Sequence, residues 1–207
     1  MAVVMGGMKG EEGAQYYLRY HDHGEEIYDL DKFTSKQQAT LAIQSKEESI
    51  KGGCQCGGVQ FTLLRPRESK GKHEACLCMC RSCRLSFGQP LTAWAMRIPF
   101  DRVYTEQGSV HDGSLFGTLC RYQSSERATR DFCGKCGASV FFQTIDRPGK
   151  VDIAFGLLQA PEGMRGSSWF EWDSKGVHFP EDAVDKALIE MVNANYSKLS
   201  TSVKPES

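Results

Sequence analysis

Apolar residues recur at every second position in the middle of the chain, and this period predicts short strands. Residues 59–64 place valine, phenylalanine and leucine on alternate positions, as a strand with one buried face does. Residues 92–98 and 138–144 show similar strand patterns, whereas 151–158 is almost wholly apolar, which indicates burial on both faces. Two further short strands are predicted at 119–123 and 128–132.

Turn-forming residues separate these strands. Glycine occurs with aspartate or proline at 112–113, 147–149 and 161–163, where the chain is expected to reverse. Short strands joined by such turns predict an all-β core.

The two ends of the chain differ from this core. Residues 1–50 are polar and lack cysteine, and we expect an N-terminal extension there, with a short strand at 15–20 and a helix at 35–48. The core domain is predicted at 51–180, followed by a C-terminal helix and tail at 181–207. The helix itself is predicted at 181–197, after Pro180, with an apolar face formed by Ala183, Ala187, Leu188, Met191 and Val192.

Composition and charge narrow the class of protein. The 207 residues carry a net charge of -1 without a basic stripe, which argues against a nucleic-acid partner. No apolar run approaches the ~20 residues of a membrane-spanning helix, and the N-terminus does not resemble a secretory signal. We therefore expect a cytoplasmic protein without a membrane partner. Thiols stay reduced there, so the nine cysteines indicate metal ligands or reactive groups.

Eight of the nine cysteines fall into three clusters. The first and third clusters are glycine-flanked pairs, and two pairs together supply the four sulfur ligands of a structural zinc. Such a site would tie the first strand of the core to a later hairpin. The clusters are Cys54 and Cys56, then Cys76, Cys78, Cys80 and Cys83, then Cys133 and Cys136.

Two of the cysteine motifs also have other interpretations. Cys120 stands alone, and a lone cysteine is usually a small buried side chain. A Cys-x-x-Cys motif also serves redox chemistry, but no βαβ pattern surrounds the third cluster.

The middle cluster has a different ligand count. Cys78, Cys80 and Cys83 supply three sulfurs, the number found where catalytic zinc keeps one position for water or substrate. A soft thiol substrate would suit such a site. The alternative is a closed structural site in which Cys76 is the fourth ligand.

These motifs together resemble the glutathione-dependent formaldehyde-activating enzyme family, also called the CENP-V/GFA domain. The resemblance rests on GGCQCGGVQFTL, on CMCRSCR followed by Gly88, on RDFCGKCGASVFF and on VDIAFGLLQAPEG. It runs from about Gly52 to Pro180, roughly three-fifths of the chain.

The resemblance implies a β-tent fold of folded antiparallel sheets stapled by zinc. It also implies two zinc ions, one structural and one more labile at the active site. The structural ion would be held by the first and third clusters, and the labile ion by Cys78, Cys80 and Cys83. Family members act as carbon–sulfur lyases on glutathione adducts, and the type reaction joins glutathione to formaldehyde. Glutathione is therefore a candidate co-substrate.

The sequence departs from the family pattern in three places. Met79 stands where family members often have histidine, Cys76 is an additional thiol, and the N-terminal extension is long.

Other side chains are candidates for binding or catalysis. Glutathione carries two carboxylates, so Arg84 and Arg130 are predicted to orient it, with Arg81 and Arg127 as further candidates. The alternative for each arginine is a solvated surface charge. His73 is a candidate acid or base, or a surface residue. The three tryptophans, expected to pack in the core or to line a pocket, are Trp94, Trp169 and Trp172.

The leading functional prediction is a zinc-dependent carbon–sulfur lyase acting on a glutathione adduct or a related small electrophilic metabolite. A related prediction is isomerisation or ring-opening of a small metabolite. The alternative from another class is a non-enzymatic zinc module that binds protein or chromatin. That alternative calls for a basic tail, whereas the short tail of this chain holds only two lysines, Lys198 and Lys204.

Overall fold

The computed structural model describes residues 48–67, 71–163 and 165–201. The predicted strand at 15–20 lies outside these residues, as does the predicted helix at 35–48 except for Glu48. Ser49 and Ile50, placed in the extension by the sequence, begin the first strand instead.

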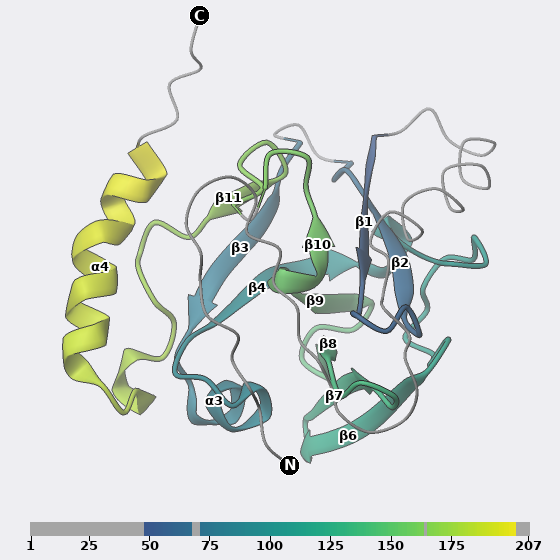
Figure 1. The fold of residues 1–207 in the computed structure, drawn as a ribbon, viewed down its shortest axis with the longest axis horizontal. Helices are drawn as coiled ribbons and strands as arrows, with labels where there is room; N and C mark the ends of the chain where they lie inside the picture. The colour runs from purple at the N-terminus through teal and green to yellow at the C-terminus, as the bar shows by residue number, and fades with distance from the viewer. Residues whose placement is uncertain (1–47, 68–70, 164, 202–207) are drawn as a thin grey trace, which may run out of the picture.

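Eleven strands in the described residues form two sheets (Figure 1). The smaller sheet has the order β10-β1-β2-β5 and is antiparallel throughout. Its strands are β1 (Ser49–Gly53), β2 (Gln60–Leu64), β5 (Val103–Thr105) and β10 (Leu158–Gln159).

The larger sheet has the order β11-β3-β4-β9-β8-β7-β6 and is antiparallel except where β11 joins β3. Its strands are β3 (His73–Cys78), β4 (Thr92–Pro99), β6 (Leu119–Ser125), β7 (Ala128–Cys133), β8 (Ser139–Thr144), β9 (Lys150–Ala154) and β11 (Phe170–Trp172). The mostly β architecture confirms the predicted all-β core.

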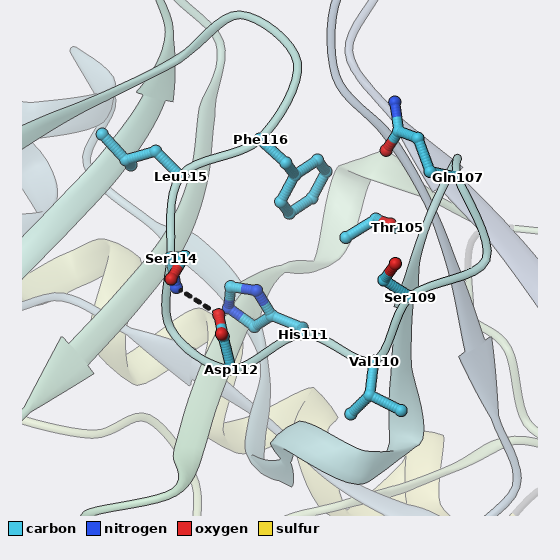
Figure 2. A pocket seen from close by; sticks show the side chains of 9 residues that line it. All are labelled: Thr105, Gln107, Ser109, Val110, His111, Asp112, Ser114, Leu115 and Phe116. Carbon is cyan, nitrogen blue, oxygen red and sulfur yellow. Dashed lines mark hydrogen bonds between the residues drawn. The ribbon is translucent and has the colours of Figure 1, made fainter.

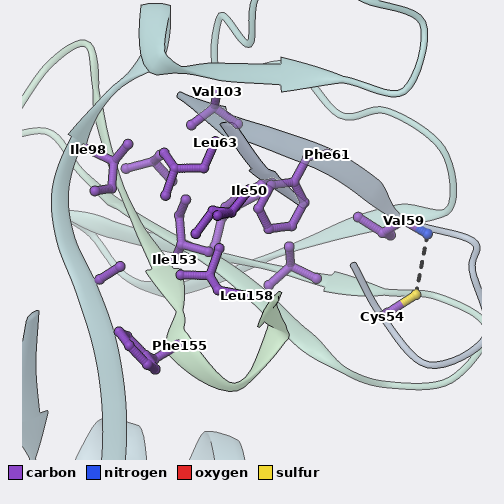
Figure 3. Packing of buried hydrophobic residues seen from close by; sticks show 14 of the residues in the cluster. Ile50, Cys54, Val59, Phe61, Leu63, Ile98, Val103, Ile153, Phe155 and Leu158 are labelled. Atoms are coloured by element: carbon purple, nitrogen blue, oxygen red, sulfur yellow. Dashed lines mark hydrogen bonds between the residues drawn. The ribbon is translucent and has the colours of Figure 1, made fainter. Parts of the chain in front are cut away.

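The main hydrophobic core draws side chains from both sheets (Figure 3). Phe61 and Leu63 contribute from the smaller sheet, and Ala95, Phe141 and Ile153 from the larger one. Because successive strand residues point to opposite faces, their neighbours in the larger sheet face away from this core.

A second, smaller cluster of buried residues lies on the opposite face of the larger sheet. It contains Cys76, Cys78, Cys83, Trp94 and Ala154, of which all but Cys83 lie in strands of the larger sheet. The larger sheet therefore separates the main core from a cysteine-rich cluster.

The apolar run at 151–158 does not form one strand. β9 ends at Ala154, a 3-10 turn covers Phe155–Leu157, and β10 then pairs with β1 in the smaller sheet. The run is mostly apolar because most of its residues stay buried while the chain moves from one sheet to the other.

One helix was not predicted. α3 (Arg81–Phe87) begins after Cys80, whose side chain accepts a hydrogen bond from the Cys83 amide, and ends at Gly88 with positive φ. Its seven residues are too few to show a helical apolar period.

The C-terminal helix α4 (Lys186–Thr201) begins later than predicted, after a 3-10 turn at Pro180–Asp182. The predicted apolar face was partly wrong, because Met191 is 59% exposed whereas Tyr196 is buried. Asn193 of α4 accepts a hydrogen bond from the Val177 amide, and the helix lies at the β3 side of the larger sheet (Figure 1). Among the described helices, none has the length and apolar character needed to cross a bilayer.

Candidate metal centres

The first and third cysteine clusters meet in space. Cys54 and Cys56 follow β1, Cys133 ends β7, and Cys136 lies in the turn before β8. Their four Sγ atoms all lie within 4.8 Å of one another. The predicted link between the first core strand and a later hairpin is therefore present.

The spacing of these sulfurs fits zinc rather than a disulfide. The Sγ atoms of Cys54 and Cys56 are 3.5 Å apart, as are those of Cys56 and Cys133. A tetrahedral ion with sulfur at ~2.3 Å separates its ligands by ~3.8 Å, whereas a disulfide needs ~2.05 Å. We refer to these four residues as the four-cysteine site.

Backbone and hydroxyl donors surround the four-cysteine site. The Val59 amide donates to Cys54 Sγ at 3.3 Å, and Thr118 Oγ1 lies 3.0 Å from Cys133 Sγ. Burial raises the pKa of Cys133, but hydrogen bonds from Thr118 and from the amides of Cys136 and Lys135 outweigh it and bring the pKa to about 6. Burial raises the pKa of Cys54 to about 12, so this thiol stays protonated at neutral pH unless a cation offsets the cost of burying its charge.

The two glycines of the third motif serve different purposes. Gly137 has φ +75°, a conformation that glycine adopts readily. Gly134 does not have positive φ, but a Cβ there would come within 2.7 Å of Cys120 Sγ. Cys120 is exposed, so its predicted burial was wrong. It lies on β6, at the edge of the larger sheet.

The middle motif forms a second group. Cys78 ends β3, Cys80 caps α3, and Cys83 lies in the first turn of that helix. Their Sγ atoms lie within 4.8 Å of one another, and we call them the three-cysteine site. The strand-to-helix turn brings Cys80 and Cys83 back toward the strand end.

Cys76 is not part of this group. In the described part of the chain, the residues grouped here as metal ligands are Cys78, Cys80 and Cys83 alone. Cys76 shares the β3 face with Cys78 but is 2% exposed, and burial raises its pKa to about 12. The extra thiol thus has the environment of a packed core residue.

Arg130 connects the three-cysteine site to the larger sheet. Its Nη2 atom donates to Ser82 Oγ at 3.0 Å and to Cys83 Sγ at 3.5 Å. The guanidinium lies 4.9 Å from the Phe142 ring centroid and 5.8 Å from that of Trp94. Within the described residues its Nε and Nη1 atoms have no hydrogen-bond partner, although Arg130 is only 6% exposed.

The thiols of the three-cysteine site shift one another's pKa values. Hydrogen bonds with Cys78 and Cys80 lower the pKa of Cys83 against the effect of burial, and the charge of Arg130 lowers it further. The same contacts raise the pKa of Cys78. The group is thus arranged to hold negative charge at sulfur.

The other predicted arginines have separate surroundings. Arg84 lies on α3, partly buried, with an Nε atom that lacks a partner among the described residues. Arg127 is exposed and pairs with Asp146, and Arg81 is also exposed. Among the described contacts of these four arginines, the side chain of Arg130 reaches a cysteine sulfur, whereas Arg84 contacts Cys80 through its backbone amide.

The described hydrogen bond and ring contact of the predicted histidine, His73, involve no residue of the two cysteine sites. His73 is buried, and its Nε2 atom lies 2.8 Å from the Leu64 carbonyl oxygen. The expectation of a surface residue was therefore wrong. Its partner is a backbone carbonyl on β2, so the contact it makes is structural.

The tryptophans divide between core and site. Trp94 packs in the cluster that contains Cys78 and Cys83, whereas Trp169 lies in the main core under the guanidinium of Arg65. Trp172 is partly buried against the main core.

Met79, which departs from the family pattern, is 1% exposed. Its amide donates to the His178 carbonyl oxygen at 3.0 Å. A buried apolar side chain therefore occupies the position between Cys78 and Cys80 in the chain.

Sequence reasoning missed two side chains at these sites. Thr118 and Ser82 supply hydroxyls to the four-cysteine and three-cysteine sites, respectively. Ser82 lies inside the motif, which is a usable signal, but Thr118 is 15 positions from Cys133 and only the fold places it there.

The chain was compared with curated proteins and with solved structures. A search of the curated proteins finds no match. Among solved structures, a Rhodobacter sphaeroides protein determined as a structural genomics target matches at 22% identity and a TM-score of 0.39. The match covers 59% of this chain and 99% of that protein.

A family model described as "Glutathione-dependent formaldehyde-activating enzyme" matches residues 49–171. This span is more than half of the chain and contains both cysteine sites. The chain therefore belongs to the glutathione-dependent formaldehyde-activating enzyme family.

Proposed function

We propose that this protein is a zinc-dependent carbon–sulfur lyase that forms or cleaves a bond between the glutathione sulfur and a small electrophilic carbon. The observation that carries the proposal is the three-cysteine site beside a buried arginine with unused donors. Membership of the glutathione-dependent formaldehyde-activating enzyme family supports a reaction of this class.

The two cysteine sites are proposed to differ in role. Cys54, Cys56, Cys133 and Cys136 supply the full ligand set of a structural zinc. Cys78, Cys80 and Cys83 supply one ligand fewer, which suits a zinc that exchanges an external ligand. A zinc ion bound there would supply positive charge that favours a substrate thiolate over a thiol.

Arg130 is proposed to orient the substrate. Its buried guanidinium already contacts Cys83 Sγ, and its Nε and Nη1 atoms are the unpartnered donors. A carboxylate of glutathione is the natural acceptor for either donor, because a hydrogen bond between a guanidinium and a carboxylate is charge-assisted. Arg84 supplies a second unpartnered nitrogen from α3 and is proposed to assist.

The proposed addition balances without a redox partner. The glutathione sulfur forms a bond to the carbonyl carbon, the carbonyl π electrons move to oxygen, and the proton lost from sulfur is gained by that oxygen. The reverse reaction breaks the carbon–sulfur bond and returns the proton to sulfur. The chain's contribution is to hold the thiolate, through the three-cysteine site, and to fix its carboxylate through Arg130.

A binding experiment tests the proposal. Glutathione and S-methylglutathione should be titrated into zinc-loaded protein and into its Cys80→Ser variant by calorimetry. Wild-type protein should bind glutathione at least tenfold more tightly than S-methylglutathione, because only the former presents a thiolate. Cys80→Ser should lose that preference.

An activity experiment provides a second test of the proposed lyase function. Formation of the adduct from glutathione and ¹³C-formaldehyde should be followed by NMR against the uncatalysed rate, with other small aldehydes in parallel. Absence of both thiol-dependent binding and rate enhancement in protein carrying two zinc ions would overturn the proposal in favour of a binding module.

A further inference from the structure

A cavity of about 280 Å³ lies away from the cysteine ligands, in the segment between β5 and β6. It is lined from residue 105 to residue 116 (Figure 2). Its volume is close to the lower end of the range for small-molecule sites in proteins. None of the residues that line it belongs to the four-cysteine or three-cysteine site.

The cavity is built around His111. Figure 2 shows its imidazole in the middle of the ring of lining side chains. The ring stacks on Phe141 with centroids 5.1 Å apart and meets Phe100 and Phe116 edge-on at 4.9 and 5.7 Å. This packing fixes the orientation of the imidazole.

Buried polar atoms in the cavity wall have no partner. His111 is 2% exposed, and within the described residues neither of its ring nitrogens has a hydrogen-bond partner. Thr105 Oγ1, also in the wall, is likewise buried and unpartnered in this part of the chain. Buried polar groups are normally paired, so these three atoms point to a missing acceptor and donor.

The mouth of the cavity combines polar side chains, among them the exposed Gln107, Ser109 and Ser114, with apolar ones. Val110 and Leu115 are 45% and 47% exposed, and Phe116 lines the wall beside them. Ordered water satisfies isolated buried polar atoms, but water gains nothing from the apolar part of the wall, which is formed by Val110, Leu115 and Phe116. The combination matches a ligand with a polar head and an apolar body.

The charges around His111 favour a neutral head group. Burial lowers the pKa of His111, so at neutral pH one ring nitrogen donates and the other accepts. The pKa of His111 is raised by the nearby carboxylates of Asp131 and Asp112 and lowered by the guanidinium of Arg121. An anionic ligand would meet Asp112 in the wall, whereas an amide or a hydroxyl offers both a donor and an acceptor.

The sheet separates this cavity from the three-cysteine site. Phe141 and Phe142 are adjacent on β8 and therefore point to opposite faces. Phe141 packs against His111, whereas Phe142 packs against Trp94 and Arg130. The cavity and the proposed reaction site thus use opposite faces of one strand.

We propose that His111 and Thr105 form a second binding site, which takes a small neutral molecule with an amide or hydroxyl head and an apolar body. The head pairs with the imidazole and the hydroxyl, and the body covers Val110, Leu115 and Phe116. The site is independent of the proposed lyase reaction.

Benzamide is a suitable probe, with benzyl alcohol as a second neutral ligand and benzoate as the charged isostere. Each should be titrated into zinc-loaded protein while amide resonances of residues 105–116 are followed by ¹⁵N NMR. Benzamide and benzyl alcohol should shift these resonances and saturate, and benzoate should bind at least tenfold more weakly.

Variants of the cavity residues distinguish a loss of hydrogen bonds to benzamide from a loss of packing. His111→Phe keeps the aromatic packing but removes both nitrogens, and it should weaken benzamide binding about tenfold or more. Thr105→Val is the second variant, and it keeps the test decisive if His111→Phe does not fold. Thr92→Val is the matched control, because its buried hydroxyl is also unpartnered among the described residues but lies outside the cavity.

Zinc content and glutathione binding, measured alongside, should be the same in wild type and in Thr105→Val, so failure here is distinguishable from failure of the lyase proposal. Two results would overturn the second site. One is the absence of saturable shifts at residues 105–116 with either neutral probe, as expected if only water occupies the cavity. The other is unchanged benzamide affinity in the foldable variants of His111 and Thr105.

Discussion

Arg130 Nη2 lies 3.5 Å from Cys83 Sγ, although the two residues are 47 positions apart in the chain. Arg130 belongs to β7 and Cys83 to α3, so the contact joins the sheet to the helix that carries two candidate ligands. The same strand ends at Cys133 of the four-cysteine site. β7 therefore carries one residue for each cysteine site, three positions apart.

Replacing Arg130 should impair substrate binding more than metal binding. In Arg130→Met, the apolar packing on Phe142 is largely kept but the donors are lost, and kcat/KM for the glutathione adduct should fall at least tenfold. Zinc content should stay at the wild-type value. Arg127→Met is the matched control, because Arg127 is exposed and pairs with Asp146, and its kinetics should be unchanged. Equal activity in both variants would contradict the assigned role of Arg130.

The two cysteine sites should respond differently to loss of one ligand. Cys133 is fully buried and joins the end of β7 to the segment after β1, so Cys133→Ser should prevent stable folding. Cys80 is partly exposed and caps α3, where serine is also a good cap, so Cys80→Ser should stay folded and lose one zinc. Metal analysis and circular dichroism of the two variants would show this. Equal unfolding would refute the division into structural and labile sites.

Removal of Cys76 should leave both metal sites intact. Cys76→Ala takes one buried sulfur from a packed cluster, which should cost about 1 kcal/mol of folding stability. Zinc content should equal that of wild type, whereas Cys78→Ala should lose one equivalent. Denaturant unfolding and metal analysis would measure the two effects. Loss of zinc from Cys76→Ala would show that this thiol closes the three-cysteine site.

Acid should destabilise the protein in part through His73. Burial lowers its pKa below the ordinary value of 6.5, so the unfolded chain takes up a proton before the folded one does. The contribution of neutral His73 to the free energy of unfolding is therefore complete above about pH 6.5. It falls as the pH drops below this value, by at most ~1.4 kcal/mol per pH unit.

His73→Gln isolates this effect, because glutamine keeps a donor for the Leu64 carbonyl but does not titrate. Urea unfolding of wild type and His73→Gln between pH 7.5 and 5 should show the wild type losing stability relative to the variant. A difference that stays constant across this range would exclude His73 as a source of acid sensitivity.

Local patterns anticipated several strands close to their observed limits. β2, β4 and β8 lie within or almost within their predicted limits, because alternation of side chains is a property of each strand alone. The run at 151–158 was predicted as a single strand because continuous burial does not reveal a change of sheet. α3 was missed because seven residues dominated by ligands and arginines carry little periodic signal.

The cysteine spacing by itself determined the two ligand groups, because glycine-flanked pairs and a Cys-x-Cys-x-x-Cys turn constrain thiols over a few residues. Tertiary structure decided three matters that spacing leaves open. It set Cys76 apart from the three-cysteine site, placed Arg130 against Cys83, and left His111 unpartnered in a cavity within the described residues. Each depends on which strand faces meet across the sheets, and that arrangement follows from the packing of segments far apart in the chain.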